Sequence, residues 1–403
     1  MMKVETASLL KEKVYLDNNA TTFLHPRLRE MVPLWLEHSG NPSSIHWGGR
    51  GPKNLIREAR QNVAHMIGSD ILEVVFTASG SESNNTILKG VYFQQMKAPK
   101  PRRHYLIGAV EHPSVLVTSK FLESLGAEID YIPVTPEGSI DLDVFKSKLR
   151  PDTALVSCML ANNETGSIFP IKKMAALAHD VGALFHTDAV QALGKIPVNV
   201  KDLGVDFASL AGHKFYSLRG VGVLYQKRGT SFESLIHGGG QERHRRAGTE
   251  NTLAIASLGF MAGEIKNLQS YYENMKSLRD HFESQVLERI PNVSITGSLS
   301  PRLPNTSSLV IEGVEGETLL MNLDMEGFAI STGAACSSGN PEPSSTLMAM
   351  GLTRRQAQSS LRVSLGWQTR REEIEAFILC LEDVVQRLRS FQNTGNYGEG
   401  EYA

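Results

Sequence analysis

The sequence has little cysteine, no long apolar run and almost no net charge, and each shortage excludes a class of protein. Three cysteines in 403 residues cannot form the disulfide framework of a small secreted domain, and they favour a reducing compartment. No apolar run approaches the roughly 20 residues that a membrane-spanning helix needs. The segment 1–13 carries charged residues where a signal peptide would have its apolar core. We therefore expect a cytoplasmic protein with no membrane association.

The charge balance argues against nucleic acid as a partner. With 41 basic and 43 acidic residues the net charge is -2, so the chain lacks the electrostatic footprint of a nucleic-acid-binding protein. Its 41% hydrophobic and 21% charged residues are ordinary for a globular enzyme. The length exceeds the size at which a single core usually stops growing, which predicts two domains. No metal site is predicted.

Strands and helices alternate through the first part of the chain. Helical stretches of this length between strands predict βαβ units and a mostly parallel sheet. Ligands of such sheets bind at the carboxyl ends of the strands. The predicted strands are 73–77, 104–110, 128–133, 153–160, 183–187, 206–211 and 220–225, and the predicted helices between them include 113–125, 141–149 and 170–181.

The pattern changes after Thr249, where a long helical stretch over 251–290 is expected to cross to a second domain. We expect a large domain over 16–268 and a smaller α+β domain over 1–15 and 269–403. A strand at Val14–Leu16 would return to the smaller domain, and 393–403, which lacks periodicity, is expected to be disordered. The other elements predicted for the smaller domain are strands near 293–296, 306–312 and 361–365 and helices near 316–325 and 372–390.

Lys214 lies between two predicted strands, in the stretch Ser209–Tyr216. A buried lysine is unfavourable unless its charge is neutralised or used. One use is a covalent bond to an aldehyde cofactor such as pyridoxal phosphate, which a lysine of lowered pKa can form. A surface lysine at the end of a strand is the plainer alternative. The hypothesis therefore depends on whether the other groups that this cofactor needs also follow strand ends.

Three such groups do follow strand ends. Asp188 can pair with a protonated pyridine nitrogen, and Gln191, on the same helical face, can donate to the phenolic oxygen of the cofactor. The turn Ser79–Ser81 leads directly into a helix, whose first N–H groups and dipole attract a phosphate. Each group also has an ordinary alternative, because aspartate and serine are common helix caps.

Two further side chains have a chemical and a structural interpretation. His112 begins a helix after a predicted strand, and a neutral imidazole there can stack on a cofactor ring and exchange protons with a substrate. Arg362 lies in an alternating strand and can bind a substrate carboxylate with two N–H groups. A buried structural histidine and a surface arginine are the alternatives.

The three cysteines lie in different contexts. Cys158, in an apolar strand, and Cys380, on the apolar face of the last helix, are predicted to be small buried hydrophobic residues. Cys336 lies in Ser331–Pro341, a stretch of small residues typical of a flexible loop. A thiol there can approach a cleft and leave it again, which suits a mobile nucleophile.

Short motifs in this order match a known family: Tyr15–Thr22, Gly40–Ser44, Glu111–His112, Asn162–Glu164, Asp188–Gln191, Gly212–Lys214, His237–Glu242, Arg246–Thr249 and the Cys336 loop. The chain resembles the cysteine desulfurases of the NifS/IscS type, within the class V aminotransferase fold, from about Val14 to Leu388. The length of the Cys336 loop resembles group I of these enzymes. The resemblance implies an α/β fold of the pyridoxal phosphate-dependent transferase type (fold type I), with helices flanking a mostly parallel sheet, and a homodimer.

The resemblance implies pyridoxal 5'-phosphate bound to Lys214. Ala211 departs from the family pattern, because many relatives carry a serine hydroxyl there for the phosphate. The residues that the resemblance places around the cofactor are Gly80, Ser81, His112, Asn163, Asp188, Gln191, His213 and Thr249 of the partner subunit.

The implied substrate is L-cysteine, with its carboxylate held by Asn163 and Arg362. Cys336 would attack the substrate sulfur, keep it as a persulfide and release L-alanine, and an Fe–S scaffold or another acceptor protein would receive the sulfur. Three alternatives stay open from the sequence. They are a selenocysteine lyase or an aminotransferase of the same fold, and a non-catalytic sulfur carrier.

Overall fold

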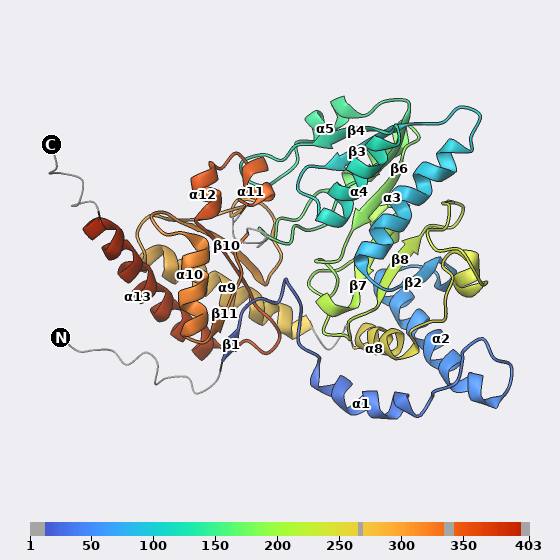
Figure 1. Cartoon of the computed structure of the whole chain (residues 1–403), viewed down its shortest axis with the longest axis horizontal. Helices are drawn as coiled ribbons and strands as arrows, with labels where there is room; N and C mark the ends of the chain where they lie inside the picture. Colours follow the sequence, from blue (N-terminus) through green and yellow to red (C-terminus); the bar gives the residue numbers. More distant parts are fainter. Residues whose placement is uncertain (1–12, 265–268, 334–341, 396–403) are drawn as a thin grey trace.

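The computed structural model describes residues 13–264, 269–333 and 342–395. Figure 1 shows two groups of elements side by side: a large sheet covered by helices, and a smaller assembly formed mainly by the last third of the chain. None of the helices in the described ranges is long and apolar enough to cross a membrane.

The large sheet has seven strands, six of which run parallel to one another. Only β8 runs antiparallel, to its neighbours on both sides. The α/β fold with a mostly parallel central sheet is therefore confirmed. In spatial order the strands are β2 (Val74–Thr77), β8 (Gly222–Gln226), β7 (Phe207–Ala211), β6 (Leu184–Asp188), β5 (Thr153–Ser157), β3 (His104–Gly108) and β4 (Glu128–Ile132).

Helices cover both faces of this sheet (Figure 1). They are α1 (Pro26–Leu36), α2 (Trp47–Ile67), α3 (Gly80–Met96), α4 (Pro113–Ser124), α5 (Leu142–Lys148), α6 (Ile171–Asp180), α7 (Val200–Leu203) and α8 (Thr252–Gly263).

Alternation along the strands divides the core of the sheet between its two faces. Val74 and Phe76 pack into the cluster that contains α2, α6 and α8, whereas Val75 packs into the cluster with α3 and α4. Successive residues of a strand point to opposite faces, so a strand covered on both sides is apolar throughout. This explains the continuous apolar runs from which the strands were predicted.

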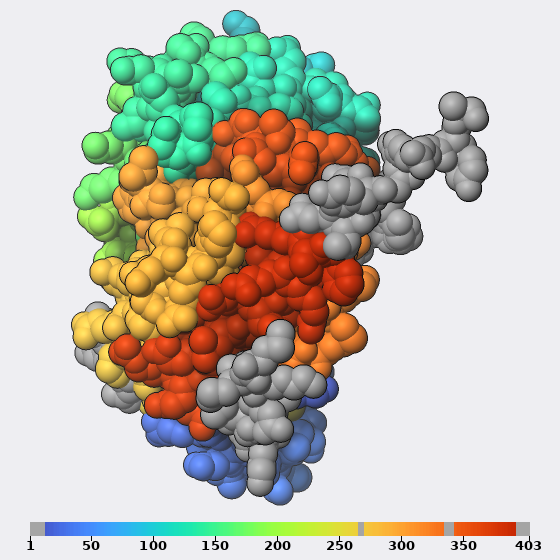
Figure 2. Space-filling view, turned by 90° about the vertical axis from the view of Figure 1, so that its left-hand side faces the viewer, coloured from blue at the N-terminus to red at the C-terminus, as the bar shows by residue number. Residues whose placement is uncertain are grey.

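The smaller assembly has its own hydrophobic cluster around a three-stranded antiparallel sheet. Its strands, in spatial order, are β12 (Ser360–Ser364), β10 (Thr306–Ile311) and β9 (Val293–Ile295). Its helices are α9 (Gln269–Arg289), α10 (Gly316–Met325), α11 (Ser345–Ala349), α12 (Arg354–Gln358) and α13 (Arg371–Gly395). Figure 2 shows α9 and α13 lying next to each other on the outer face of this assembly.

The large sheet and the smaller assembly have separate hydrophobic cores. On this basis we propose domain boundaries of 16–268 for a large domain and of 1–15 with 269–403 for a small one. The short strand β1 (Val14–Tyr15) pairs in parallel with β11 (Phe328–Ala329). Val14 and Phe328 belong to the cluster of the smaller assembly, so the strand expected to return there does so.

Two sequence predictions need correction. The helical stretch over 251–290 is two helices, because α8 ends at Gly263 and α9 begins at Gln269. The apolar α8 packs closely on α2, while α9 packs on α13 in the smaller assembly. The last helix extends to Gly395, into the stretch expected to be disordered, and 396–403 lie outside the described residues.

Candidate active site

A cavity of about 280 Å³ lies at the carboxyl ends of β2, β5, β6 and β7 and reaches across to β12. Parallel strands bring their ends to one edge of the sheet, so side chains distant in sequence meet there. Its lining residues are Asn19, Ala20, Ser79, Gly80, Ser81, Asn84, His112, Ser114, Met159, Ala161, Asn163, Asp188, Val190, Gln191, Ala211, His213, Lys214 and Arg362.

Lys214 lies in the short 3-10 turn that follows β7 and presents its amine to the cavity. Its Nζ donates to the carbonyl oxygens of Asn19, at 2.5 Å, and of Ala20, at 2.6 Å. Burial lowers the pKa of Lys214 to about 8, with a further decrease from Arg362 and opposing increases from Asp17 and Asp188. About a tenth of this amine is therefore unprotonated and nucleophilic at pH 7, far more than for a lysine of ordinary pKa.

Asp188 is the last residue of β6 and is buried. Its Oδ2 accepts a hydrogen bond from Asn84 Nδ2 at 2.7 Å, and its Oδ1 accepts one from the backbone N–H of Val190 at 2.9 Å. Burial raises the pKa of Asp188, and these two donors only partly oppose the increase. A buried carboxylate of this kind gains most from a cationic partner in the cavity.

His112 caps the N-terminus of α4, and its hydrogen bonds define its tautomer. Its Nδ1 accepts from the backbone N–H of Ser114 at 3.1 Å, so the proton of the neutral ring is on Nε2. Desolvation lowers the pKa of His112, Asp188 opposes that decrease, and Lys214 adds to it. The ring is therefore neutral near pH 7.

The start of α3 forms one wall of the cavity. Ser79 caps the helix by accepting from the backbone N–H of Glu82 at 3.1 Å, and the next two residues face the cavity with their N–H groups unpaired within the helix. A Cβ added to Gly80 would lie 2.7 Å from Val190 Cγ2, so only glycine fits this wall. His213 lies nearby, and burial lowers its pKa to about 4, which leaves a neutral ring.

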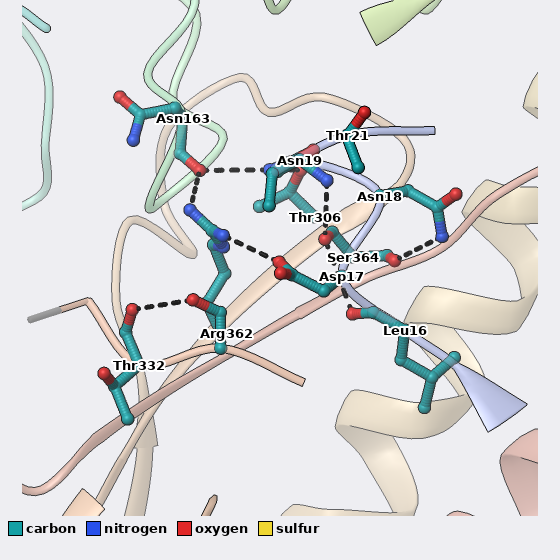
Figure 3. Close-up of polar contacts among 12 residues, drawn as sticks. Leu16, Asp17, Asn18, Asn19, Thr21, Asn163, Thr306, Thr332, Arg362 and Ser364 are labelled. Atoms are coloured by element: carbon teal, nitrogen blue, oxygen red, sulfur yellow. Dashed lines mark hydrogen bonds and ion pairs between the residues drawn. The ribbon is translucent and has the colours of Figure 1, made fainter. Parts of the chain in front are cut away.

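Arg362, on β12, is buried, and Figure 3 shows two polar contacts of its guanidinium. One terminal nitrogen donates to Asp17 Oδ1 at 2.8 Å, and the other donates to the carbonyl oxygen of Asn163 at 3.1 Å. The buried Nε has no hydrogen-bond partner among the described residues. An anion at this end of the cavity would therefore find a guanidinium with unused donor capacity.

The ends of the segment that contains Cys336 lie close to this arginine. Ser331 pairs with Arg362 through two backbone hydrogen bonds, of 3.2 and 2.7 Å. On the other side, Thr346 Oγ1 donates to Glu164 at 2.9 Å, and Ser344 Oγ donates to the same carboxylate. Burial raises the pKa of Glu164, and the two hydroxyls and Arg362 oppose the increase. Both ends of the segment are thus attached beside the cavity, while Cys336 itself lies outside the described residues.

Comparison with known proteins assigns this architecture to a family. Residues 14–377 match the family model of the class V aminotransferases. The chain belongs to the class V aminotransferase family. It is 45% identical over 383 residues to the cysteine desulfurase IscS of Dictyoglomus turgidum, covering 94% of this chain and 96% of the relative.

Two solved structures with similar folds agree with this assignment. A NifS-like protein superposes with a TM-score of 0.87 at 34% identity, covering 93% of this chain and all of the other. A structure described as SspA in complex with cysteine superposes with a TM-score of 0.77 at 31% identity, covering 87% of this chain and 98% of the other. The resemblance to the NifS/IscS type is therefore confirmed, and with it the pyridoxal phosphate-dependent transferase fold.

The cavity fits pyridoxal phosphate, the cofactor of this family. It offers an amine of lowered pKa on Lys214 and a buried carboxylate on Asp188, which suits a pyridinium nitrogen. Gly80 and Ser81 line the cavity at the start of a helix, where free N–H groups can bind a phosphate. Ala211 also lines the cavity, so the hydroxyl that many relatives offer the phosphate at this position is missing here.

The cavity brings together most of the residues predicted from the sequence. Of that set, Thr249 is exposed and does not line it. Cys158 and Cys380 are buried free thiols, as predicted. The predicted residues that line the cavity are Gly80, Ser81, His112, Asn163, Asp188, Gln191, His213, Lys214 and Arg362.

Several polar residues of the site were not predicted individually. Asn84 gives no signal in the sequence, because an asparagine in a helix interior has no fixed role. Asp17 and Asn19 lie in the motif Tyr15–Thr22, which contributes to the family resemblance but gives neither residue a predicted role of its own. The contact of Asp17 with Arg362 joins residues far apart in the chain, and no local pattern predicts such a contact.

Proposed function

We propose that this chain is a pyridoxal phosphate-dependent cysteine desulfurase, which removes sulfur from L-cysteine, releases L-alanine and keeps the sulfur as a persulfide on Cys336. The observation that supports this most is the combination at one cavity of a nucleophilic lysine, a carboxylate-binding arginine and the ends of a segment that contains a thiol. The amino-acid chemistry needs Lys214 and Arg362, and the sulfur chemistry needs Cys336. The relatives named as cysteine desulfurases support the same conclusion.

The residues of the cavity divide the work of the reaction. Arg362 and Asn163 bind the carboxylate of L-cysteine. The carboxylate accepts from the terminal nitrogen of Arg362 that donates to Asp17 in this structure. Pyridoxal phosphate, bound to Lys214 and held by Asp188 and Gln191, supplies an electron sink for the carbon skeleton of the substrate. Lys214 Nζ, with a pKa near 8, is suited to take a proton from the substrate α-carbon.

Proton transfer at the sulfur end falls to His112. Its neutral ring carries a proton on Nε2 and lines the cavity, so it can exchange a proton with the substrate thiol. Ser114 holds the ring in this tautomer by donating to Nδ1. Gly80, Ser81 and His213 hold the phosphate, through N–H groups, a hydroxyl and a neutral imidazole.

The sulfur transfer balances without an oxidant. The thiolate of Cys336 attacks the substrate sulfur, so an S–S bond forms while the Cβ–S bond of the substrate breaks. The electron pair of the broken bond goes to Cβ, which takes up a proton to become the methyl group of L-alanine. A thiol of an acceptor protein then takes the terminal sulfur of the persulfide, for Fe–S cluster assembly or for thiolation.

The quaternary structure and the compartment belong to the same proposal. Thr249 is exposed and lies outside its own cavity, which fits a homodimer in which Thr249 of the partner subunit reaches the phosphate. A persulfide survives only where neither oxidants nor competing disulfides consume it, so we assign the enzyme to the cytoplasm.

The test is a comparison of the Cys336→Ala variant with a Cys380→Ala control, which removes a buried thiol. We expect Cys336→Ala to lower alanine formation from L-cysteine at least about 10³-fold and to abolish protein-bound sulfane sulfur, because the nucleophile is lost. The visible absorption of the bound cofactor should persist in both variants. Alanine and bound sulfane sulfur formed by Cys336→Ala would contradict the proposal.

The same variant separates the alternatives. A selenocysteine lyase needs no thiol nucleophile of its own, so Cys336→Ala would keep full activity on selenocysteine. An aminotransferase would convert a keto acid in a half-reaction that Cys336→Ala leaves intact. A non-catalytic carrier would form no alanine even as the unmodified chain.

A further inference from the structure

A second lysine, Lys195, is buried beside the cavity without lining it. It follows Gln191 by four residues in the turns after β6, and only 5% of its surface is exposed. Its Nζ lies 2.9 Å from Asn19 Oδ1 and 2.7 Å from Gln191 Oε1. Among the described residues no carboxylate lies within ion-pair distance of it, whereas most of the other lysines and arginines with buried side chains are paired.

The two partners suit an uncharged amine. Within 13–264, 269–333 and 342–395, Lys195 donates to two amide oxygens and to no other group, and a neutral amine has two N–H groups to donate. Burial lowers the pKa of Lys195 well below its usual value, and the positive charges of Lys214 and Arg362 lower it further. A buried lysine with no counter-charge avoids the cost of desolvation by losing its proton.

The contact with Lys195 fixes which way the Gln191 amide points. A side-chain amide has one accepting end and one donating end, and the hydrogen-bond partners decide their placement. Gln191 Oε1 accepts from Lys195, and Nε2 donates to the carbonyl oxygen of Asn19 at 2.9 Å. Within the described chain the second N–H of Gln191 Nε2 has no recorded acceptor, and the residue lines the cavity.

The same contacts connect Lys195 with Lys214 through one residue. Asn19 accepts from Lys195 with its side chain, and its carbonyl oxygen accepts from both Gln191 and Lys214. Asn19 Nδ2 donates to the carbonyl oxygen of Asn163 and to Thr306 Oγ1, at 3.0 and 2.9 Å (Figure 3). Asn19 is therefore held from several sides, and Lys195 acts on a group that has little freedom to adjust.

We propose that Lys195 is a positioning residue, which orients the Gln191 amide so that an N–H of Nε2 is available to the phenolic oxygen of the cofactor. This inference rests on the proposed function, since it assigns a role toward the cofactor bound at that site. A hydrogen bond to the phenolic oxygen stabilises its negative charge and so weakens its attraction for a proton on the lysine nitrogen. Lys195 thereby lowers the pH at which the cofactor bound to Lys214 changes its protonation state.

The test is a pH titration of the visible absorption band of the holoenzyme, with the variants Lys195→Met, Gln191→Leu and the double variant. Methionine fills the space of the lysine without a polar atom. We expect Lys195→Met to raise the midpoint by about half to one pH unit, which corresponds to one lost hydrogen bond. The exposed Lys201→Met, which loses only a contact with Asp70, should leave it unchanged.

The double variant separates positioning from a merely structural role. If Lys195 acts through Gln191, adding Lys195→Met to Gln191→Leu shifts the midpoint no further. A Lys195→Met variant that melts at a lower temperature without the cofactor, but titrates like the unmodified holoenzyme, would overturn the inference. Should Lys195→Met fail to fold, Lys195→Leu, which also has no N–H donor for Gln191 Oε1, should raise the midpoint by a similar amount. No shift in that variant would overturn the inference as well.

The proposed function fails in a different way. If the unmodified chain shows no visible absorption band with pyridoxal phosphate, both proposals are wrong. If the unmodified holoenzyme titrates normally and forms a persulfide while Lys195→Met leaves the midpoint in place, only the role of Lys195 is wrong.

Discussion

The two sides of the cavity are built differently. On the side of the large sheet, Lys214, Asp188 and His112 follow strand ends, and burial shifts the pKa of each. On the opposite side a single arginine projects from the antiparallel strand β12 and forms an ion pair with Asp17. The first side changes the protonation of its groups, whereas the second offers a fixed positive charge.

This difference indicates how the work is shared between the sides. Groups with shifted pKa values are suited to bond to a cofactor and to move protons. An arginine stays charged at any working pH and is suited to hold a carboxylate. Substitutions on the first side should therefore change the state of the cofactor, and substitutions on the second side should change the affinity for the substrate.

The strongest test of the first side is Lys214→Ala. We expect at least about a 10³-fold loss of alanine formation, because the covalent anchor and the proton acceptor are both removed. Borohydride reduction followed by peptide mass analysis should find the cofactor attached to Lys214 in the unmodified enzyme and nowhere in the variant. The exposed Lys172→Ala is the control, and a cofactor trapped on another lysine would contradict the assignment.

On the second side, Arg362→Gln should raise KM for L-cysteine by about 10- to 100-fold, as expected for the loss of charged hydrogen bonds. The absorption spectrum of the bound cofactor should stay the same. Arg302→Gln is a matched control, because Arg302 forms a buried ion pair with Glu283, at 2.7 Å, in the smaller assembly. It should lower stability without raising KM. Equal effects of both substitutions on KM would remove the distinction between the two sides.

The pH dependence of cofactor uptake tests how one side acts on the other. Only the unprotonated amine of Lys214 reacts with an aldehyde, so uptake by the cofactor-free protein should rise with pH through a midpoint near 8. Since Arg362 lowers this pKa and Asp17 raises it, Arg362→Gln should move the midpoint up and Asp17→Asn should move it down. Stopped-flow absorbance measures the rate. A midpoint near 10.5, the ordinary value for lysine, would contradict the effect of burial.

The smallest effect is expected at Glu164, which attaches one end of the Cys336 segment. Thr346→Val removes one hydroxyl donor at constant volume and should lower the free energy of unfolding in urea by about 1 kcal/mol. Thr318→Val is the control, because the Thr318 hydroxyl also donates to a glutamate at 2.9 Å but in an exposed position. An equal decrease in the free energy of unfolding for Thr318→Val would show that the buried bond to Glu164 contributes no more than an exposed one.

The sequence predicts the large sheet well because its strands are apolar on both faces and separated by helices of regular length. It predicts the cavity residues from the same pattern, since polar residues after strand ends meet at one edge. The break between α8 and α9 is not predicted, because the packing that distinguishes the two helices, of α8 on α2 and of α9 on α13, exists only in three dimensions.

Contacts between distant parts of the chain limit how much of the site can be predicted from the sequence. Asp188 is predictable from its place after a strand, but its donor Asn84 comes from the middle of a helix. Lys195 has the same difficulty, because its lack of a carboxylate partner appears only in three dimensions. Motifs identify the groups that react, whereas only the folded structure shows which neighbours shift their pKa values and orient them.

The pairing of Ser331 with Arg362 has a consequence for substrate choice. Arg362, which we propose binds the carboxylate of the substrate, is joined to Ser331, at the start of the segment that contains the thiol, by backbone hydrogen bonds of 2.7 and 3.2 Å. If the proposed function holds, the carboxylate site and the attachment point of the thiol segment cannot move apart, so the distance from carboxylate to sulfur in the substrate should matter for the rate. Homocysteine is longer by one methylene, and we expect its kcat/KM to be lower by about 10- to 200-fold.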